Sequence, residues 1–212
     1  MCSSDLFALT NVASLLMAFG MFGSIFFLAQ YFQTVQGYSP LQSGLRILPW
    51  TAMPMIVAPI AGALSDRIGG QRLMAAGLAL QSAGLLWIAA VSTPTTPYVD
   101  FVGPFVLSGI GMGLFFAPVA NVVLSSVRPE HEGKASGATN AIRELGGVFG
   151  VAVLAAVFSH VGGYQTSESF VHGLTTAVYI GGALVAVGAV AAALIKPRAA
   201  GRPAVVALEA AA

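Results

Sequence analysis

Three ionisable residues, Arg46, Arg143 and Glu144, lie inside long apolar stretches of the sequence. A charge at the centre of a bilayer costs about 2.5–3.5 kcal/mol on insertion scales, so each needs a partner or a path to water. Glu144 could take up and release a proton if it were buried, and Arg143 could form an ion pair at an interface. Adjacent residues on a helix point about 100° apart, so we do not expect these two to pair on one helix face. Arg46 lies near the end of its stretch and is expected to snorkel outward.

The sequence contains few residues that could bind a metal or carry out catalysis. Cys2 is the only cysteine, and the three histidines, His131, His160 and His172, are far apart, so no metal-ligand spacing is present. The sequence contains no P-loop, paired catalytic aspartates or His-Glu metal motif. We therefore expect neither an enzyme nor an ATP-driven pump, and no cofactor. The net charge of +1 gives no reason to expect a nucleic-acid partner.

The composition indicates that lipid surrounds these residues. Of 212 residues, 57% are hydrophobic and 8% are charged, whereas soluble domains average about 25% charged residues. A helix needs about 20 apolar residues to cross a bilayer, and six stretches of that size cover residues 7–33, 41–64, 71–92, 99–126, 136–160 and 171–195. We predict an all-α membrane protein with a six-helix bundle over residues 7–195 and a disordered cytoplasmic tail over residues 196–212.

Residues 1–6 do not resemble a signal peptide, because no cation precedes the first apolar stretch. We interpret them as the scar of a truncation or of sequence assembly. An ordinary short polar N-terminus is the alternative.

The cations predict the orientation. Arg67 and Arg72 flank the second connection between spans, and Arg128 and Lys134 lie in the fourth. Three more, Lys196, Arg198 and Arg202, follow the sixth span, whereas the opposite connections contain no Lys or Arg. By the positive-inside rule, both termini are expected in the cytoplasm, in a membrane of the bacterial cytoplasmic (inner) type.

Small residues and prolines predict how the helices pack. Gly109 and Gly113, like Gly146 and Gly150, have the GxxxG spacing that lets helix backbones approach closely in lipid. Prolines interrupt the hydrogen bonding of helices, so kinks or local unwinding are expected in the second span at Pro49, Pro54 and Pro59, and in the fourth at Pro118.

The connection over residues 62–72 combines a small residue, an Asp-Arg pair, a glycine turn and a further Arg; its key residues are Gly62, Asp66, Arg67, Gly69, Gly70 and Arg72. It resembles the loop signature called motif A of the major facilitator superfamily, in the copy found in the C-terminal half. We expect positive φ at the two adjacent glycines. The resemblance implies that Asp66 engages a helix of a missing N-terminal half. A solvated loop that only sets the topology is the alternative.

Two further segments, residues 30–44 and residues 128–147, look like signatures of the fourteen-helix drug:proton antiporter branch of that superfamily. The resemblance implies the C-terminal half of a secondary active transporter that exports hydrophobic or cationic small organic compounds by alternating access, in exchange for protons. Its partners would be the lipid bilayer, the organic substrate, protons and the N-terminal half.

The same resemblance implies roles for the spans. The first and fourth would line the substrate cavity, with Asn11, Met21, Gln30 and Phe115 as candidates, and the second and fifth would face the other half. Ordinary helix packing is the alternative for each residue. Transport of a specific small metabolite, or a non-catalytic membrane module, is the alternative function.

Overall fold

The computed structural model describes residues 3–124 and 127–194, in which every regular element is a helix. These are α1 (Ser3–Gln30), a short π-helix (Tyr31–Val35), α2 (Pro40–Thr51), α3 (Met53–Ile68), α4 (Gly70–Val91), α5 (Val99–Leu124), a 3-10 turn (Pro129–His131), α6 (Glu132–Val161) and α7 (Ser167–Ala193). Within the described residues, 6 helical segments are long and apolar enough to cross a membrane, with α2 and α3 together forming the second. The predicted six-span, all-α fold is confirmed. The tail over residues 196–212, with its three cations, lies outside the described residues.

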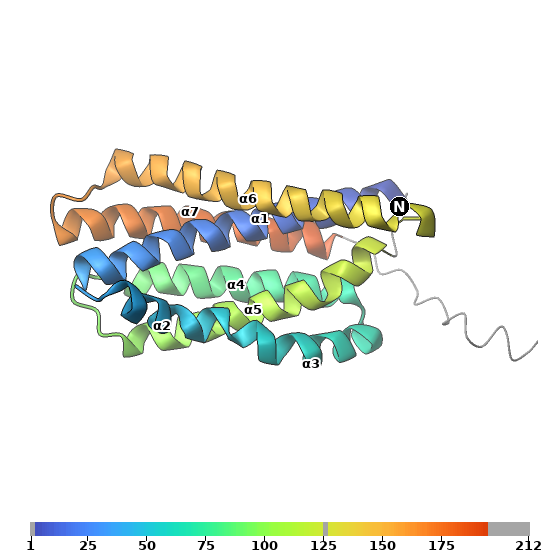
Figure 1. The fold of residues 1–212 in the computed structure, drawn as a ribbon, viewed down its shortest axis with the longest axis horizontal. Coiled ribbons are helices and arrows are strands. Elements are labelled where there is room, and N and C mark those ends of the chain that lie inside the picture. The colour runs from blue at the N-terminus through green and yellow to red at the C-terminus, as the bar shows by residue number, and fades with distance from the viewer. Residues whose placement is uncertain (1–2, 125–126, 195–212) are drawn as a thin grey trace, which may run out of the picture.

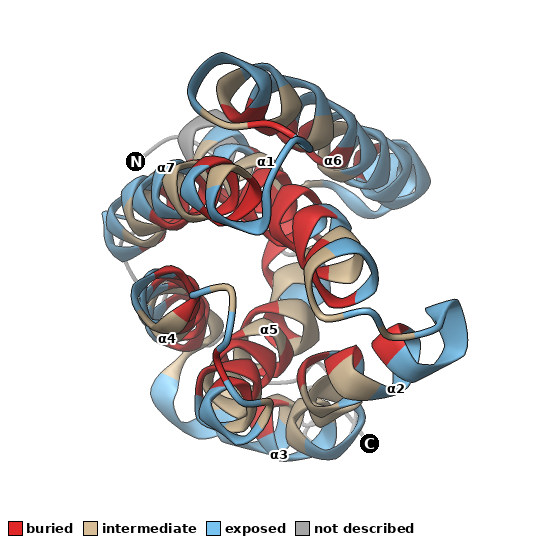
Figure 2. Ribbon diagram, turned by 90° about the vertical axis from the view of Figure 1, so that its left-hand side faces the viewer, coloured by how far each residue is buried: buried red, intermediate tan, exposed pale blue. Residues whose placement is uncertain are grey.

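The spans run side by side along one long axis (Figure 1). α4 packs against α5 and α7, α1 packs against α6 and α7, and α3 packs against α5. Seen along the axis, α2 and α6 lie at the edge away from α4 (Figure 2). In the most apolar part of each span, 17% of the second and 28% of the fifth are buried, compared with 61% of the first. The second and fifth spans are therefore the least buried of the six.

The second span begins with a capping box and is broken at its middle. Ser39 and Gln42 exchange side-chain and backbone hydrogen bonds at the start of α2. The break falls at Ala52, two residues before Pro54, which has no N–H to donate to the carbonyl of Trp50. The predicted interruption is therefore located here. The prolines at 49, 59 and 118 lie inside continuous helices.

The glycine pair of α5 provides a close helix contact, as predicted. A Cβ atom at Gly109 would collide with the Trp50 carbonyl oxygen and Met53, and one at Gly113 would collide with Val57. The absence of side chains at these two positions lets α5 approach both pieces of the broken span.

A polar network joins two connections at one end of the bundle. The Tyr31 hydroxyl donates a 2.6 Å hydrogen bond to the Thr93 carbonyl oxygen. The Gln36 amide donates to the Tyr31 hydroxyl at 2.8 Å and to the Pro94 carbonyl oxygen at 3.2 Å. The network ties the end of the first span to the connection that follows α4.

Arg46 lies near the same end and stacks on tyrosines. Its guanidinium carbon is 3.4 Å from the centroid of the Tyr38 ring and 5.4 Å from that of Tyr98. The Tyr98 hydroxyl donates to the Arg46 carbonyl oxygen at 3.1 Å. Burial raises the pKa of the Tyr98 phenol above its ordinary value, while the Arg46 cation acts in the opposite direction. The Arg46 charge is thus held by aromatic faces at the edge of its span.

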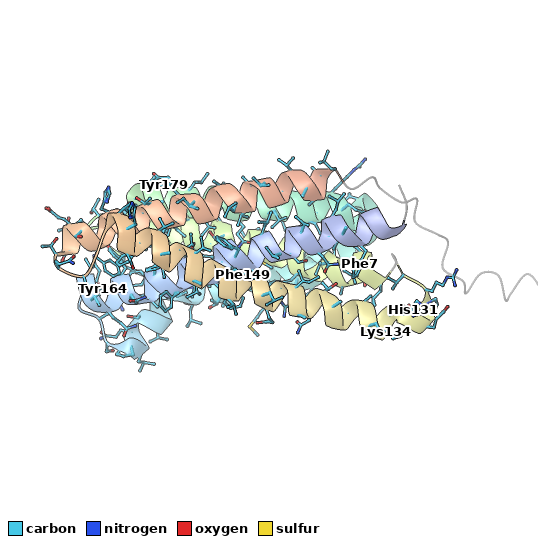
Figure 3. All side chains as sticks on the ribbon, turned by 90° about the horizontal axis from the view of Figure 1, so that it is seen from above. Phe7, His131, Lys134, Phe149, Tyr164 and Tyr179 are labelled. Carbon is cyan, nitrogen blue, oxygen red and sulfur yellow. The ribbon has the colours of Figure 1, made fainter. Side chains whose placement is uncertain are left out.

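The described cations flanking the other connections gather at the opposite end. The α3–α4 and α5–α6 connections lie at the same end of the bundle as the start of α1 (Figure 1). His131 and Lys134 are at that end and Tyr164 is at the other (Figure 3). Arg67, Arg72 and Lys134 are all exposed. This is the grouping on which the orientation prediction rests.

Candidate functional site: a groove with one carboxylate between α1 and α6

A groove of about 420 Å³ lies along the seam between α1 and α6. Five of its six lining residues are apolar and the sixth is a carboxylate: Phe22, Glu144, Gly147, Val148, Val151 and Ala152. α6 has 30 residues, about 45 Å of helix, and Glu144 lies about 18 Å from its start. A single acidic group in an apolar groove well inside a span is the main chemical feature of this surface.

Glycines of α6 allow its backbone to approach that of α1 closely. A Cβ atom at Gly146 would collide with the Leu15 carbonyl oxygen, and one at Gly150 with the Phe19 carbonyl oxygen. One at Gly147 would lie 2.8 Å from the Phe22 ring. The predicted close approach at the GxxxG pair of α6 is confirmed, and the partner is α1. Because the backbones touch here, Phe22 and Glu144 open onto the same groove.

Glu144 pairs with its neighbour. The Arg143 Nη2 atom lies 3.1 Å from the Glu144 Oε1 atom and 2.5 Å from the Asn140 Oδ1 atom. Our expectation that the adjacent residues would not pair was wrong, because both side chains are long enough to bend toward each other across the helix surface. The Glu144 side chain is 58% exposed and that of Arg143 is 32% exposed. Such a pair is weak in water, and Glu144 remains accessible from the groove.

Arg143 also belongs to a smaller hollow between α5 and α6. This hollow, of about 140 Å³, is lined by residues that include Thr139, Asn140 and Arg143. The Arg143 guanidinium carbon is 5.6 Å from the centroid of the Phe116 ring. The Thr139 hydroxyl is buried and has no hydrogen-bond partner among the described residues. Arg143 therefore contacts both the Glu144 carboxylate and the hollow between α5 and α6.

The four cavity candidates have different surroundings. Met21 is 4% exposed and Phe115 is fully buried in the core of the bundle. Asn11 is buried and donates to the Phe7 carbonyl oxygen at 2.8 Å, but its Oδ1 atom has no partner within the described part of the chain. Gln30 accepts a 2.6 Å hydrogen bond from the Tyr164 hydroxyl. None of the four lines the groove beside Glu144.

The loop of residues 62–72 forms the tight connection between α3 and α4. Gly69 has φ of 89°, as predicted. The expectation of a positive φ at Gly70 was wrong, because Gly70 is already the first residue of α4. A Cβ atom at Gly70 would lie 3.1 Å from Pro118, so this glycine serves close packing against α5. Gly62 has open space around it. The Asp66 side chain lies outside the described part of the structure.

The sequence model of the Major Facilitator Superfamily matches residues 3–151, which is more than half of the chain. The chain belongs to the major facilitator superfamily. Its members are transporters and not enzymes, and this one is an integral membrane protein with the helices of one half of the fold.

Relatives of this major facilitator chain include exporters. It is 35% identical over 149 residues to the uncharacterized transporter YebQ of Escherichia coli (strain K12), a match covering 70% of the chain and 32% of the relative. It is 36% identical over 141 residues to the multidrug resistance protein Stp of Mycobacterium tuberculosis (strain CDC 1551 / Oshkosh), covering 66% and 26%. The tetracenomycin C resistance and export protein of Streptomyces glaucescens is 32% identical over 70% of the chain and 28% of the relative. The matches thus span about a third or less of each relative's length.

Solved transporters share the fold of this major facilitator half. A structure described for substrate recognition in proton dependent oligopeptide transporters matches with a TM-score of 0.78 at 18% identity, covering 99% of this chain and 46% of that one. The proton:xylose symporter XylE matches with a TM-score of 0.64 at 16% identity, covering 92% and 45%. At these identities the likeness concerns the fold alone.

Sequence reasoning found Glu144 in this major facilitator half but missed the other residues of its groove. Phe22 and Val148 were hidden among many apolar residues of the same spans. One signal was available: Phe22, Phe26 and Gln30 recur every four residues and so share a face of α1. Pairing that face with α6 required the three-dimensional structure.

Proposed function

We propose that this chain is the C-terminal six-helix half of a secondary active transporter that exports hydrophobic or cationic organic compounds in exchange for protons. The observation that carries the proposal is the apolar groove with Glu144 as its one charged lining residue. Apolar walls hold an amphipathic molecule without demanding one shape, and a carboxylate favours a positive charge on it. Two relatives, a multidrug resistance protein and a tetracenomycin C resistance and export protein, support export at the family level.

Glu144 is also the proposed proton-binding group. A carboxylate inside a span marks an ion or substrate path by default, because its insertion is costly. A carboxylate that holds either a proton or an organic cation, but not both, would couple their opposite movements. Arg143 would compete for the same carboxylate while the groove is empty, at the observed distance of 3.1 Å.

The uncovered surface supports an arrangement of two halves. Alternating access in this fold requires a second six-helix unit that rocks against the first about a central site. The least buried spans, α2 with α3 and α6, are those we propose to face the missing N-terminal half. Exposed apolar residues on them include Met55, Ile60 and Val148, which are 80%, 62% and 65% exposed.

Three earlier expectations remain part of the proposal. Asn11 and Gln30 are retained as cavity residues because each has a buried polar atom without a partner among residues 3–124 and 127–194. The loop with Asp66, Arg67 and Arg72 is proposed to contact the other half on the cytoplasmic side. Both chain ends are proposed to lie in the cytoplasm, with the bundle in the inner membrane.

The test is ethidium transport into everted membrane vesicles by a full-length transporter that contains this half. Glu144→Gln keeps the shape of the side chain and removes its charge, and it should reduce proton-driven ethidium transport about tenfold, the effect of roughly 1.4 kcal/mol. The matched control is Glu168→Gln, an exposed acid in the first turn of α7, which should leave transport unchanged. Unchanged transport in Glu144→Gln would exclude the groove carboxylate. Transport of one uncharged metabolite without ethidium would favour the alternative function.

A further inference from the structure

Tyr164, in the connection between α6 and α7, contacts three elements of the bundle although the residue is 62% exposed. Its ring centroid is 5.2 Å from that of Phe158 and 5.5 Å from that of Phe170. Its hydroxyl donates a 2.6 Å hydrogen bond to the Gln30 Oε1 atom of α1. A large aromatic ring on a short connection is thus fixed from three elements and still presents surface to the outside.

Two hollows meet at this ring. One, of about 450 Å³, is lined by Phe158, Ser159, Gly162, Gly163, Tyr164 and Gln165. The other, of about 380 Å³, is lined by Thr34, Val35, Tyr164, Gln165, Thr166, Ser167 and Phe170. Tyr164 and Gln165 belong to both, and none of the lining residues carries a charge. The surface therefore offers a ring to stack on, hydroxyl and amide groups, and no ion.

The end of α6 is fixed in a way that keeps these hollows in place. The His172 Nδ1 atom lies 2.8 Å from the Val161 carbonyl oxygen, joining α7 to the last residue of α6. A Cβ atom at Gly162 would collide with Gly173 and the Ser169 carbonyl oxygen. The backbone beneath Tyr164 is packed against α7, so the position of the ring does not depend on a loose loop.

The hollows lie at the far end of the same seam as the Glu144 groove. Ser159 follows Glu144 by 15 positions on α6, about 22 Å along the helix. On α1, Phe22, Phe26 and Gln30 share one face and lead from the groove toward Tyr164. A single drug-sized molecule does not reach both ends, so the two places can act as separate stations.

We propose that Tyr164 forms a second binding station, for uncharged aromatic compounds or for the uncharged aromatic part of a substrate, at the end of the α1–α6 seam away from Lys134. The second site adds a binding place to the proposed transporter, and its physiological role rests on the proposed transport function. Stacking on Tyr164 supplies the affinity, and the surrounding hydroxyl and amide groups accept or donate hydrogen bonds. Gln30 is a positioning residue that acts through the Tyr164 hydroxyl.

The test is photo-crosslinking of the purified chain in lipid nanodiscs with benzophenone, an uncharged molecule with two aromatic rings and one carbonyl. Labelled residues are located by peptide mass spectrometry, which separates a defined site from probe dissolved in lipid. We expect label concentrated in residues 158–170. Tyr164→Ala should reduce that label at least about fivefold, as expected for loss of an aromatic contact. The matched control is Tyr179→Ala, which removes another exposed tyrosine, 44% exposed on α7 (Figure 3), and should leave the label unchanged.

Gln30 is tested by two substitutions in the same experiment. Gln30→Met removes the acceptor of the Tyr164 hydroxyl and should lower the label, whereas Gln30→Glu retains an acceptor oxygen and should restore it. A merely structural role for Gln30 would leave the location of the label unchanged in both variants. Label spread evenly over lipid-facing residues, or label unaffected by Tyr164→Ala, would overturn the proposal.

Ethidium binding to the same samples separates this proposal from the proposed function. Tyr164→Ala should leave ethidium binding at the Glu144 groove intact, and Glu144→Gln should leave benzophenone labelling of residues 158–170 intact. If the unaltered chain does not bind ethidium, the result counts against the transport proposal. The benzophenone labelling would still test the Tyr164 site independently. Loss of both signals in Tyr164→Ala would show one shared site and contradict two stations.

Discussion

The Tyr31 hydroxyl oxygen lies 2.6 Å from the Thr93 carbonyl oxygen, and this hydrogen bond joins parts of the chain that are 62 residues apart. Tyr31 is fully buried and also accepts a hydrogen bond from the Gln36 amide. The first span, its following connection and the α4–α5 connection are thereby fixed to one another. These hydrogen bonds therefore hold that end of the bundle together as one unit.

Tyr31→Phe should destabilise the bundle. The substitution keeps the ring but leaves the Thr93 carbonyl and the Gln36 amide short of a partner, at a cost of about 1–3 kcal/mol for a buried group. The measurement is thermal unfolding of the purified chain in detergent, with Tyr179→Phe, on an exposed tyrosine, as the control. Equal melting temperatures for the Tyr31 variant and the unaltered chain would show that this hydrogen bond does not stabilise the bundle.

Arg46→Met should also lower stability, by about 0.5–2 kcal/mol, because the stack on the Tyr38 ring at 3.4 Å is lost. A double-mutant cycle with Tyr38→Leu measures the coupling directly. Additive effects of the two changes would show that the stack contributes nothing.

Stability should fall as the pH rises above the ordinary tyrosine pKa of about 10. Burial raises the pKa of Tyr98 in the folded chain. A group whose folded pKa is raised contributes stability below its unfolded pKa and loses it as the pH rises through the folded value. Thermal unfolding measured from about pH 8 to about pH 11, on both sides of that ordinary pKa, should show a smaller loss of stability in Tyr98→Phe than in the unaltered chain.

Gly146→Ala should destabilise the α1–α6 seam by about 1–3 kcal/mol, because its Cβ atom would meet the Leu15 carbonyl oxygen. Gly137 lies on the same helix in open space, so Gly137→Ala should be neutral or stabilising, by up to about 1 kcal/mol. Unfolding in detergent compares the pair. A larger loss in Gly137→Ala than in Gly146→Ala would contradict the close contact.

The orientation can be measured with single cysteines in a Cys2→Ser background. Glu130 and Gln165 are both exposed, and they are the sequence neighbours of His131 and Tyr164, which lie at opposite ends of the bundle (Figure 3). A membrane-impermeant maleimide should label Gln165→Cys in intact cells and Glu130→Cys only after permeabilisation. The reverse pattern would place the termini outside.

Sequence reasoning succeeded where local properties decide the structure. Apolar length determines the spans, a missing N–H at Pro54 locates the break, and the spacing of Gly146 and Gly150 predicts a close contact. It did not find the π-helix at the end of α1 or the Tyr31 network, because both depend on how distant connections pack. It misjudged Arg143 and Glu144, because backbone direction alone does not fix where long side chains go.

For the candidate site, the sequence supplied the carboxylate but not its surroundings. Phe22 and Glu144 line the same groove because α1 packs against α6, and the sequence of neither span predicts that packing. Met21 and Phe115 were chosen for their chemistry, and their burial became evident only from the packed bundle.

The break in the second span has a consequence for how this chain can change over evolutionary time. Pro54 leaves the Trp50 carbonyl without its helical donor, and a Cβ atom at Gly109 on α5 would meet both that carbonyl oxygen and the Met53 side chain. A larger residue at 109 therefore requires both α2 and α3 to move away from α5 at the break. Relatives with a larger residue at 109 should therefore also differ in the residues around the break, residues 50–54.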